Sequence, residues 1–79
     1  MANLMLYAKG KGDTRFGAVD MANGAFPVPL MYATLVPEVK LETLKQRAGL
    51  LHRMHPDTVF QVRYAGTAKV LFQSGGEAE

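Results

Sequence analysis

Apolar side chains occupy at least every second position in three segments of the chain, residues 3–9, 58–64 and 67–73. A period of two places these side chains on one face of an extended backbone, so each segment is predicted to be a β-strand. Gly66 lies between the last two segments and can supply the turn that a hairpin needs. We therefore expect strands 58–64 and 67–73 to pair with each other.

The N-terminal half shows a second hairpin pattern. Residues 15–21 are compatible with a strand, and Asn23 and Gly24 follow them. An Asn-Gly pair between apolar runs favours a hairpin turn, because both residues tolerate a positive φ. Two prolines interrupt the return strand, and proline cannot donate to a sheet, so we expect residues 26–29 to form an edge, a bulge or a kink. The apolar run at 30–36 then predicts a further strand.

One helix is predicted between Glu38 and Met54. Its apolar residues recur at spacings of three and four, which places them in a single stripe along one side of the helix. Glu42 lies near the predicted N-terminus, where the helix dipole favours negative charge. Pro56 disfavours helical geometry in the residue before it, so the helix should end near Met54. The stripe consists of Leu41, Leu44, Ala48 and Leu51.

The order β-β-β-α-β-β predicts an α+β fold, a mostly antiparallel sheet of about five strands with one helix packed on one face. A chain of 79 residues is long enough for one domain. We expect this single domain to span residues 1–73 and to leave residues 74–79 as a flexible polar tail. The predicted core comprises Leu4, Leu6, Leu30, Tyr32, Leu41, Leu44, Leu51, Phe60, Val62 and Val70.

A single helix covers only one face of such a sheet, yet the predicted strands 3–9 and 30–36 are apolar on both faces. A monomer seldom exposes a large apolar patch that has no use. We therefore expect a protein partner, or a second copy of the chain, to cover the second face. The candidate partner-binding residues are Met5, Tyr7, Met31 and Leu35. The alternative is that the proline-containing segment folds over this face, or that the sheet curls on itself.

The composition is that of a globular protein without covalent cross-links. Hydrophobic residues make up 48% of the chain and charged residues 20%, a balance that is typical of folded rather than disordered proteins. There is no cysteine, so disulfides and thiolate zinc sites are excluded. The apolar run from Leu4 to Ala8 is shorter than the ~7–15 residues of a signal-peptide core or the ~18 of a membrane span. We expect a soluble, cytoplasmic protein.

The sequence offers little catalytic or metal-binding chemistry. His52 and His55 lie three residues apart and can ligate a metal together with Asp57, but cations are also favoured at a helix C-terminus, and we prefer that interpretation. The one serine, Ser74, falls in the expected tail and there is no thiol, so no nucleophile, base and orienting group can be assembled. We therefore expect a non-enzymatic protein that holds no metal and no cofactor.

The basic residues favour a second class of function. The net charge is +2, but two of the carboxylates, Glu77 and Glu79, lie in the expected tail, so the rest of the chain is more basic. The candidate residues for binding nucleic acid are Lys9, Lys11, Arg15, Arg63 and Lys69. The predicted function is thus a small protein-interaction module, which includes a homodimer. The alternative is a small nucleic-acid-binding domain, and neither function involves a membrane.

Overall fold

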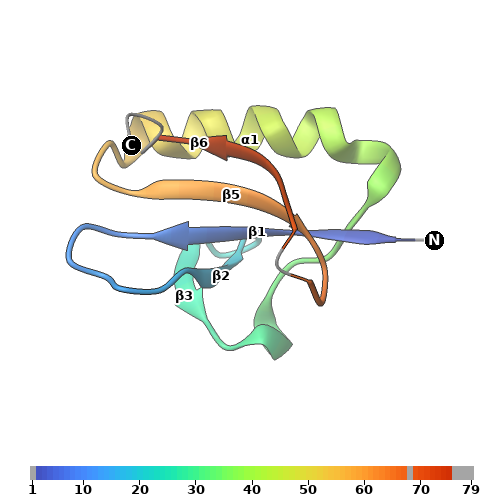
Figure 1. The fold of residues 1–79 in the computed structure, drawn as a ribbon, viewed down its shortest axis with the longest axis horizontal. Coiled ribbons are helices and arrows are strands. Elements are labelled where there is room, and N and C mark those ends of the chain that lie inside the picture. Colours follow the sequence, from blue (N-terminus) through green and yellow to red (C-terminus); the bar gives the residue numbers. More distant parts are fainter. Residues whose placement is uncertain (1, 68, 76–79) are drawn as a thin grey trace.

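The chain forms one antiparallel sheet and one α-helix (Figure 1). The computed structural model describes residues 2–67 and 69–75, with the side chain of Leu30 excepted. The strands are β1 (Asn3–Lys9), β2 (Gly17–Asp20), β3 (Ala25–Val28), β4 (Val36–Pro37), β5 (Val59–Tyr64) and β6 (Val70–Ser74), and the helices are the 3₁₀ turns η1 (Leu30–Tyr32) and η2 (Glu38–Lys40) and the α-helix α1 (Leu41–Met54). The sheet order is β3-β2-β1-β5-β6, and β4 also pairs with β1. The predicted α+β class is confirmed.

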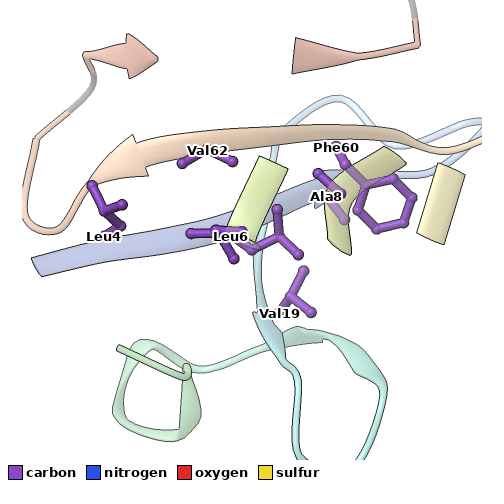
Figure 2. Packing of buried hydrophobic residues seen from close by; sticks show 8 residues of the cluster. Leu4, Leu6, Ala8, Val19, Phe60 and Val62 are labelled. Carbon is purple, nitrogen blue, oxygen red and sulfur yellow. The ribbon is translucent and has the colours of Figure 1, made fainter. Parts of the chain in front are cut away.

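The core is built on the pairing of β1 with β5, which runs along six residue pairs. Because side chains alternate along a strand, Leu4, Leu6 and Ala8 of β1 all point to the same face. They meet Phe60 and Val62 of β5 there (Figure 2). None of these five side chains is more than 3% exposed. The alternation predicted for both strands is therefore confirmed.

α1 closes this core from one side and lies mainly over β5 and β6 (Figure 1). Leu44 and Ala48, in the middle of the predicted stripe, are buried. The α-helix begins three residues later than expected, because the 3₁₀ turn η2 precedes it. It ends at Met54 as predicted, and the N–H of His55 donates to the carbonyl of Leu51 at 2.8 Å. No helix in residues 2–67 and 69–75 has both the length and the apolar character needed to cross a bilayer.

The strand predicted over residues 30–36 is wrong. Only Val36, at its end, joins the sheet as part of β4, and the preceding chain forms η1 and a loop. The cause is local, because Pro29 has no N–H for a sheet while its carbonyl accepts a hydrogen bond from the N–H of Tyr32 at 2.9 Å. Tyr32, expected in the core, is therefore 61% exposed. The side chain of Leu30, another expected core residue, lies outside the described part of the chain.

Thr34 anchors the loop that replaces this strand. Its N–H donates to the carbonyl of Val19 at 3.3 Å, and its Oγ1 accepts from the N–H of Met21 at 3.0 Å. β2 pairs with β1 at only two positions, so its remaining backbone groups need other partners. The loop supplies them and then returns the chain to β1 as β4.

Val70 is the second core residue that the sequence places wrongly, since it is 43% exposed. Val62 lies opposite Phe72, but the next residue, Arg63, lies opposite Val70. Leu71 is thus an extra residue in β6, and this bulge turns the preceding side chain, Val70, to the other face. Phe72 stays against the core, whereas Val70 lies on the face opposite α1.

The predicted hairpin around Asn23 and Gly24 is confirmed as β2 and β3. Asp20 Oδ1 accepts from the N–H of Ala22 at 3.1 Å, and the side-chain amide of Asn23 donates to Asp20 Oδ2 at 2.9 Å. The Asn23 side chain thereby lowers the pKa of the Asp20 carboxyl. Gly24 takes a positive φ of 68° in the turn. β3 is an edge strand of the sheet and ends at Val28, so residues 26–28 form an edge, one of the outcomes expected from the prolines.

The sheet extends beyond the expected domain boundary at residue 73. Ser74 is the last residue of β6. Gly75 is buried against His52, and a Cβ at this glycine would lie only 2.5 Å from the His52 Cε1 atom. The domain therefore includes residues 74 and 75, and the rest of the predicted tail, residues 76–79, lies outside the described residues.

Two glycines give a matched test of this packing. A Cβ at Gly17 would overlap the Cβ of Pro27, whereas nothing lies within 4 Å of a Cβ at Gly49. We expect Gly17→Ala to lower the free energy of unfolding by about 1–3 kcal/mol through overpacking. Gly49→Ala should raise it by up to about 1 kcal/mol, because alanine favours a helix. Urea unfolding followed by circular dichroism measures both, and an unchanged Gly17→Ala variant would contradict the close approach of β2 and β3.

Tyr64 ties the end of β5 to η2. Its hydroxyl donates to Glu38 Oε2 at 2.6 Å. This hydrogen bond, together with the negative charge of Glu38, raises the pKa of Tyr64 above its ordinary value. Since the pKa is higher in the folded state, the bond contributes fully to stability below about pH 10. That contribution is lost as the pH rises through the folded-state pKa.

We expect Glu38→Gln to lower the pKa of Tyr64 toward the ordinary tyrosine value, because both the hydrogen bond to a carboxylate and the charge are removed. Titration of the tyrosinate absorbance measures this pKa, and Tyr64→Phe identifies which step belongs to Tyr64. A Tyr64 titration that is the same with and without the Glu38 carboxylate would show that the contact does not form in solution.

Candidate functional site

The four residues predicted to bind a partner do not form one surface. Met5 is only 5% exposed, and Tyr7, next to it on the sheet, is half-buried. Met31 and Leu35 lie in the connection between β3 and β4 and are 82% and 55% exposed. Met5 is buried within a single chain. At Met5, therefore, the chain itself covers the second face of the sheet, which was the alternative to a partner. Of the four residues, only Met31 and Leu35 have largely exposed side chains, and both lie in the connection between β3 and β4.

Aromatic rings and cations occupy the sheet face opposite α1. The Arg63 Cζ atom lies 4.4 Å from the ring centroid of Tyr7 and 5.1 Å from that of Phe16. The Lys9 Nζ atom lies 5.2 Å from the same Phe16 centroid. β1 and β5 bring these residues together because Tyr7 is paired with Gln61, whose neighbour on the same face is Arg63. We call Tyr7, Lys9, Phe16, Gln61 and Arg63 the cationic face.

A relay of glutamines holds the Arg63 guanidinium over these rings. Arg63 Nε donates to Gln61 Oε1 at 2.9 Å, and Gln61 Nε2 donates to Gln73 Oε1 at 2.6 Å. Gln73 Nε2 in turn donates to the carbonyl of Gly75 at 3.0 Å. Gln61 is only 8% exposed, so its amide needs these partners. The relay thereby holds the guanidinium in one orientation over the two rings.

Arg63 has no counter-ion in the described part of the chain, where the one ion pair is Lys45 with Glu42 at 3.3 Å. Half-burial of a charge without a counter-ion costs free energy. Two cation–π contacts of about 0.5–2 kcal/mol each offset that cost. Asp13, in the adjoining loop, accepts a hydrogen bond from the N–H of Gly10 at 2.9 Å. The positive charge of Arg63 is thus positioned, and no carboxylate in residues 2–67 and 69–75 forms an ion pair with it.

The structure groups four of the five predicted nucleic-acid-binding cations, because the Arg63 guanidinium reaches from the far end of β5 over Tyr7 and Phe16 toward Lys9. Lys11 and Arg15 are exposed in the loop that follows Lys9 and leads to Phe16. Lys69 lies elsewhere, with its Nζ 5.9 Å from the ring centroid of Tyr64. Tyr64 is the neighbour of Arg63 on β5, but its ring packs against the core, so the Lys69 ammonium and the Arg63 guanidinium lie on opposite faces of the sheet. Lys69 therefore does not belong to the cationic face.

An apolar groove opens on the α1 side of the sheet, between the helix and the β2–β3 hairpin, with a volume of about 210 Å³. It exists because α1 lies over β5 and β6 and leaves the apolar side of the hairpin, where Met21 and Phe26 are half-buried, only partly covered. Leu50 and Met54 are 47% and 63% exposed at this groove. The groove is lined by Val19, Met21, Gly24 and Phe26 from the hairpin and by Arg47, Leu50, Leu51 and Met54 from α1.

Sequence reasoning missed three residues of these two surfaces for which a signal existed. Leu50 and Met54 are spaced four apart and form a short second apolar row beside the main helical stripe. Phe16 is an apolar residue that follows a loop rich in lysine and arginine. An aromatic side chain in a basic loop is a known pattern in nucleic-acid-binding surfaces.

The two histidines have different partners. His52 Nδ1 lies 2.8 Å from the carbonyl of Thr58, and because a carbonyl only accepts, this nitrogen carries the proton. The His55 ring packs edge-on against Phe26, with 5.4 Å between centroids. Within residues 2–67 and 69–75, no three side chains of His, Cys, Asp or Glu are grouped so that they could hold a metal ion.

The cationic face and the apolar groove are thus the two candidate binding surfaces, and they lie on opposite faces of the sheet. Comparisons with protein-family models, with curated proteins and with solved structures find no match to this chain.

Proposed function

We propose that the protein is a small non-enzymatic interaction module whose apolar groove binds a segment of a partner protein. The observation that carries the proposal is the groove itself, with Leu50 and Met54 exposed beside it. Each Å² of apolar surface removed from water contributes about 25 cal/mol, so a partner that covers these side chains gains affinity. Met21 and Met54 are flexible and polarizable, which suits a surface that has to fit a foreign side chain.

The size of the groove favours a protein segment over a small molecule. Pockets for drug-sized ligands usually enclose about 300–1,000 Å³, and this groove has about 210 Å³. A few anchor side chains carry most of the binding energy at a protein interface, and such anchors fit a groove of this size. An amphipathic helix presents anchors at spacings of three and four, which suits a groove with one wall made by a helix.

The charge beside the groove favours an acidic partner. Arg47 lines the groove, and α1 carries three cations, Lys45, Arg47 and Arg53, against the single carboxylate of Glu42. A second copy docked by two-fold symmetry would place the two Arg47 side chains near each other, and like charges oppose such a dimer. Carboxylates that flank the anchors of a different protein would instead pair with Arg47. The proposal is therefore an acidic amphipathic segment as the occupant.

A designed peptide tests this proposal. The probe is an amphipathic helix of about 15 residues with a leucine stripe flanked by glutamates, labelled for fluorescence anisotropy. We expect a Kd of tens of micromolar, which corresponds to about −6 kcal/mol. Leu50→Asp should weaken binding at least tenfold, because it places a charge in the groove and repels the glutamates. A peptide with lysines in place of the glutamates should also bind at least tenfold more weakly.

Met31→Asp is the matched control, because Met31 is an apolar side chain that is 82% exposed and does not line the groove. It should leave the affinity for the acidic peptide within twofold of the unmodified protein. Equal losses in Leu50→Asp and Met31→Asp would count against the groove. Sedimentation of the protein alone tests the other occupant, since a dimer that Leu50→Asp abolishes would mean that a second copy fills the groove.

A further inference from the structure

We infer that the cationic face is a second binding site, for single-stranded nucleic acid, on the opposite side of the sheet from the groove. The site does not depend on the groove, because the two share no residue. Arg63 is its centre. A guanidinium that is held in place, half-buried and without a carboxylate in the described part of the chain is prepared to bind an oxyanion such as a phosphate.

The neighbouring cations extend this site into a track. Lys9 lies beside Arg63 across the Phe16 ring, and the exposed Lys11 and Arg15 continue from it around the loop. A phosphate chain offers a series of negative charges, whereas a single small anion would engage only one part of such a track. The distribution of cations therefore fits a polyanion.

The aromatic rings indicate which polyanion. Tyr7 and Phe16 are half-buried, so part of each remains accessible beside the cations. Bases stack on aromatic rings and on guanidinium planes, and acidic polypeptides have no comparable group. The face is a sheet surface, with α1 on the opposite side, so α1 is not placed to enter the groove of a duplex bound there. These features favour unpaired bases, that is, a single strand.

The test is a salt titration with a fluorescent oligothymidylate of about 12 nucleotides. Four phosphate contacts, from Lys9, Lys11, Arg15 and Arg63, should give a log–log slope of affinity against salt near about −2.8. Replacing Lys9 and Lys11 by glutamine should flatten the slope by about 1.4, since each contact on a single strand contributes about 0.7. Absence of binding at about 20 micromolar protein in about 50 mM salt would overturn the site.

Lys69→Gln is the matched control. It removes the same charge as Lys9→Gln from a residue that the structure places away from the cationic face. We expect Lys69→Gln to leave the slope unchanged and Lys9→Gln to flatten it. Equal effects of the two variants would show that only net charge matters, which overturns the assignment of the site to this face.

Two further probes separate a nucleic acid from other polyanions. An abasic strand of the same length should bind about tenfold more weakly, because it keeps the phosphates but cannot stack on the rings. Poly-glutamate should also bind about tenfold more weakly. Equal binding of poly-glutamate would overturn the inference in favour of an acidic protein, and equal binding of the abasic strand would overturn it in favour of a simple phosphate site.

Arg63→Lys tests the centre of the site, because it keeps the charge but loses the planar group that the Gln61 relay holds. Binding of oligothymidylate should fall about fivefold, while circular dichroism and the melting temperature report whether the fold is intact. If this variant does not fold, Lys9→Gln decides, since Lys9 is at the end of β1 and outside the core. Leu50→Asp should bind the oligonucleotide normally, so failure here and failure of the groove proposal are distinguishable.

Discussion

The antiparallel pairing of β1 with β5 is the constraint on which the other features depend. Its register assigns every side chain of both strands to one of two faces. Leu4 and Leu6 meet Phe60 on the α1 side, and Tyr7 and Arg63 meet on the other. A slip of β5 by one residue would turn Arg63 into the core and expose Phe60 and Val62. The same hydrogen-bond ladder therefore specifies both the hydrophobic core and the cationic face.

The position of the single helix explains why one part of the α1 side stays open. A helix with its side chains is about 10 Å across, whereas neighbouring strands lie about 4.8 Å apart, so α1 covers roughly two strands. It lies over β5 and β6, where Leu44 and Ala48 complete the core. The apolar side of the β2–β3 hairpin at the other edge of the sheet is left only partly covered. The groove is thus a direct consequence of having one helix for a sheet of this width.

The end of β6 links the two faces. Gln73 belongs to the relay that positions Arg63, and its amide donates to the carbonyl of Gly75. Gly75 packs against the ring of His52, which lies in the last turn of α1 and donates to the carbonyl of Thr58, the residue before β5. Only a glycine fits against this ring, and its φ of 90° is one that other residues rarely adopt. The residues at the end of the sheet therefore support the helix terminus and the cationic face together.

The sequence by itself determined the elements whose signals are local: the alternation in β1 and β5, the helical stripe, and the turn at Asn23 and Gly24. These patterns are the physical cause of the structure, because period and turn chemistry act within a few residues. Tertiary structure alone decided where residues 30–36 go and which way Val70 points. The first depends on hydrogen bonds between Thr34 and a strand far from it in sequence, and the second on a bulge that reverses the alternation. The candidate sites divide in the same way: the sequence identified the cations, but only the folded chain brings Arg63 between Tyr7 and Phe16 and separates it from Lys69.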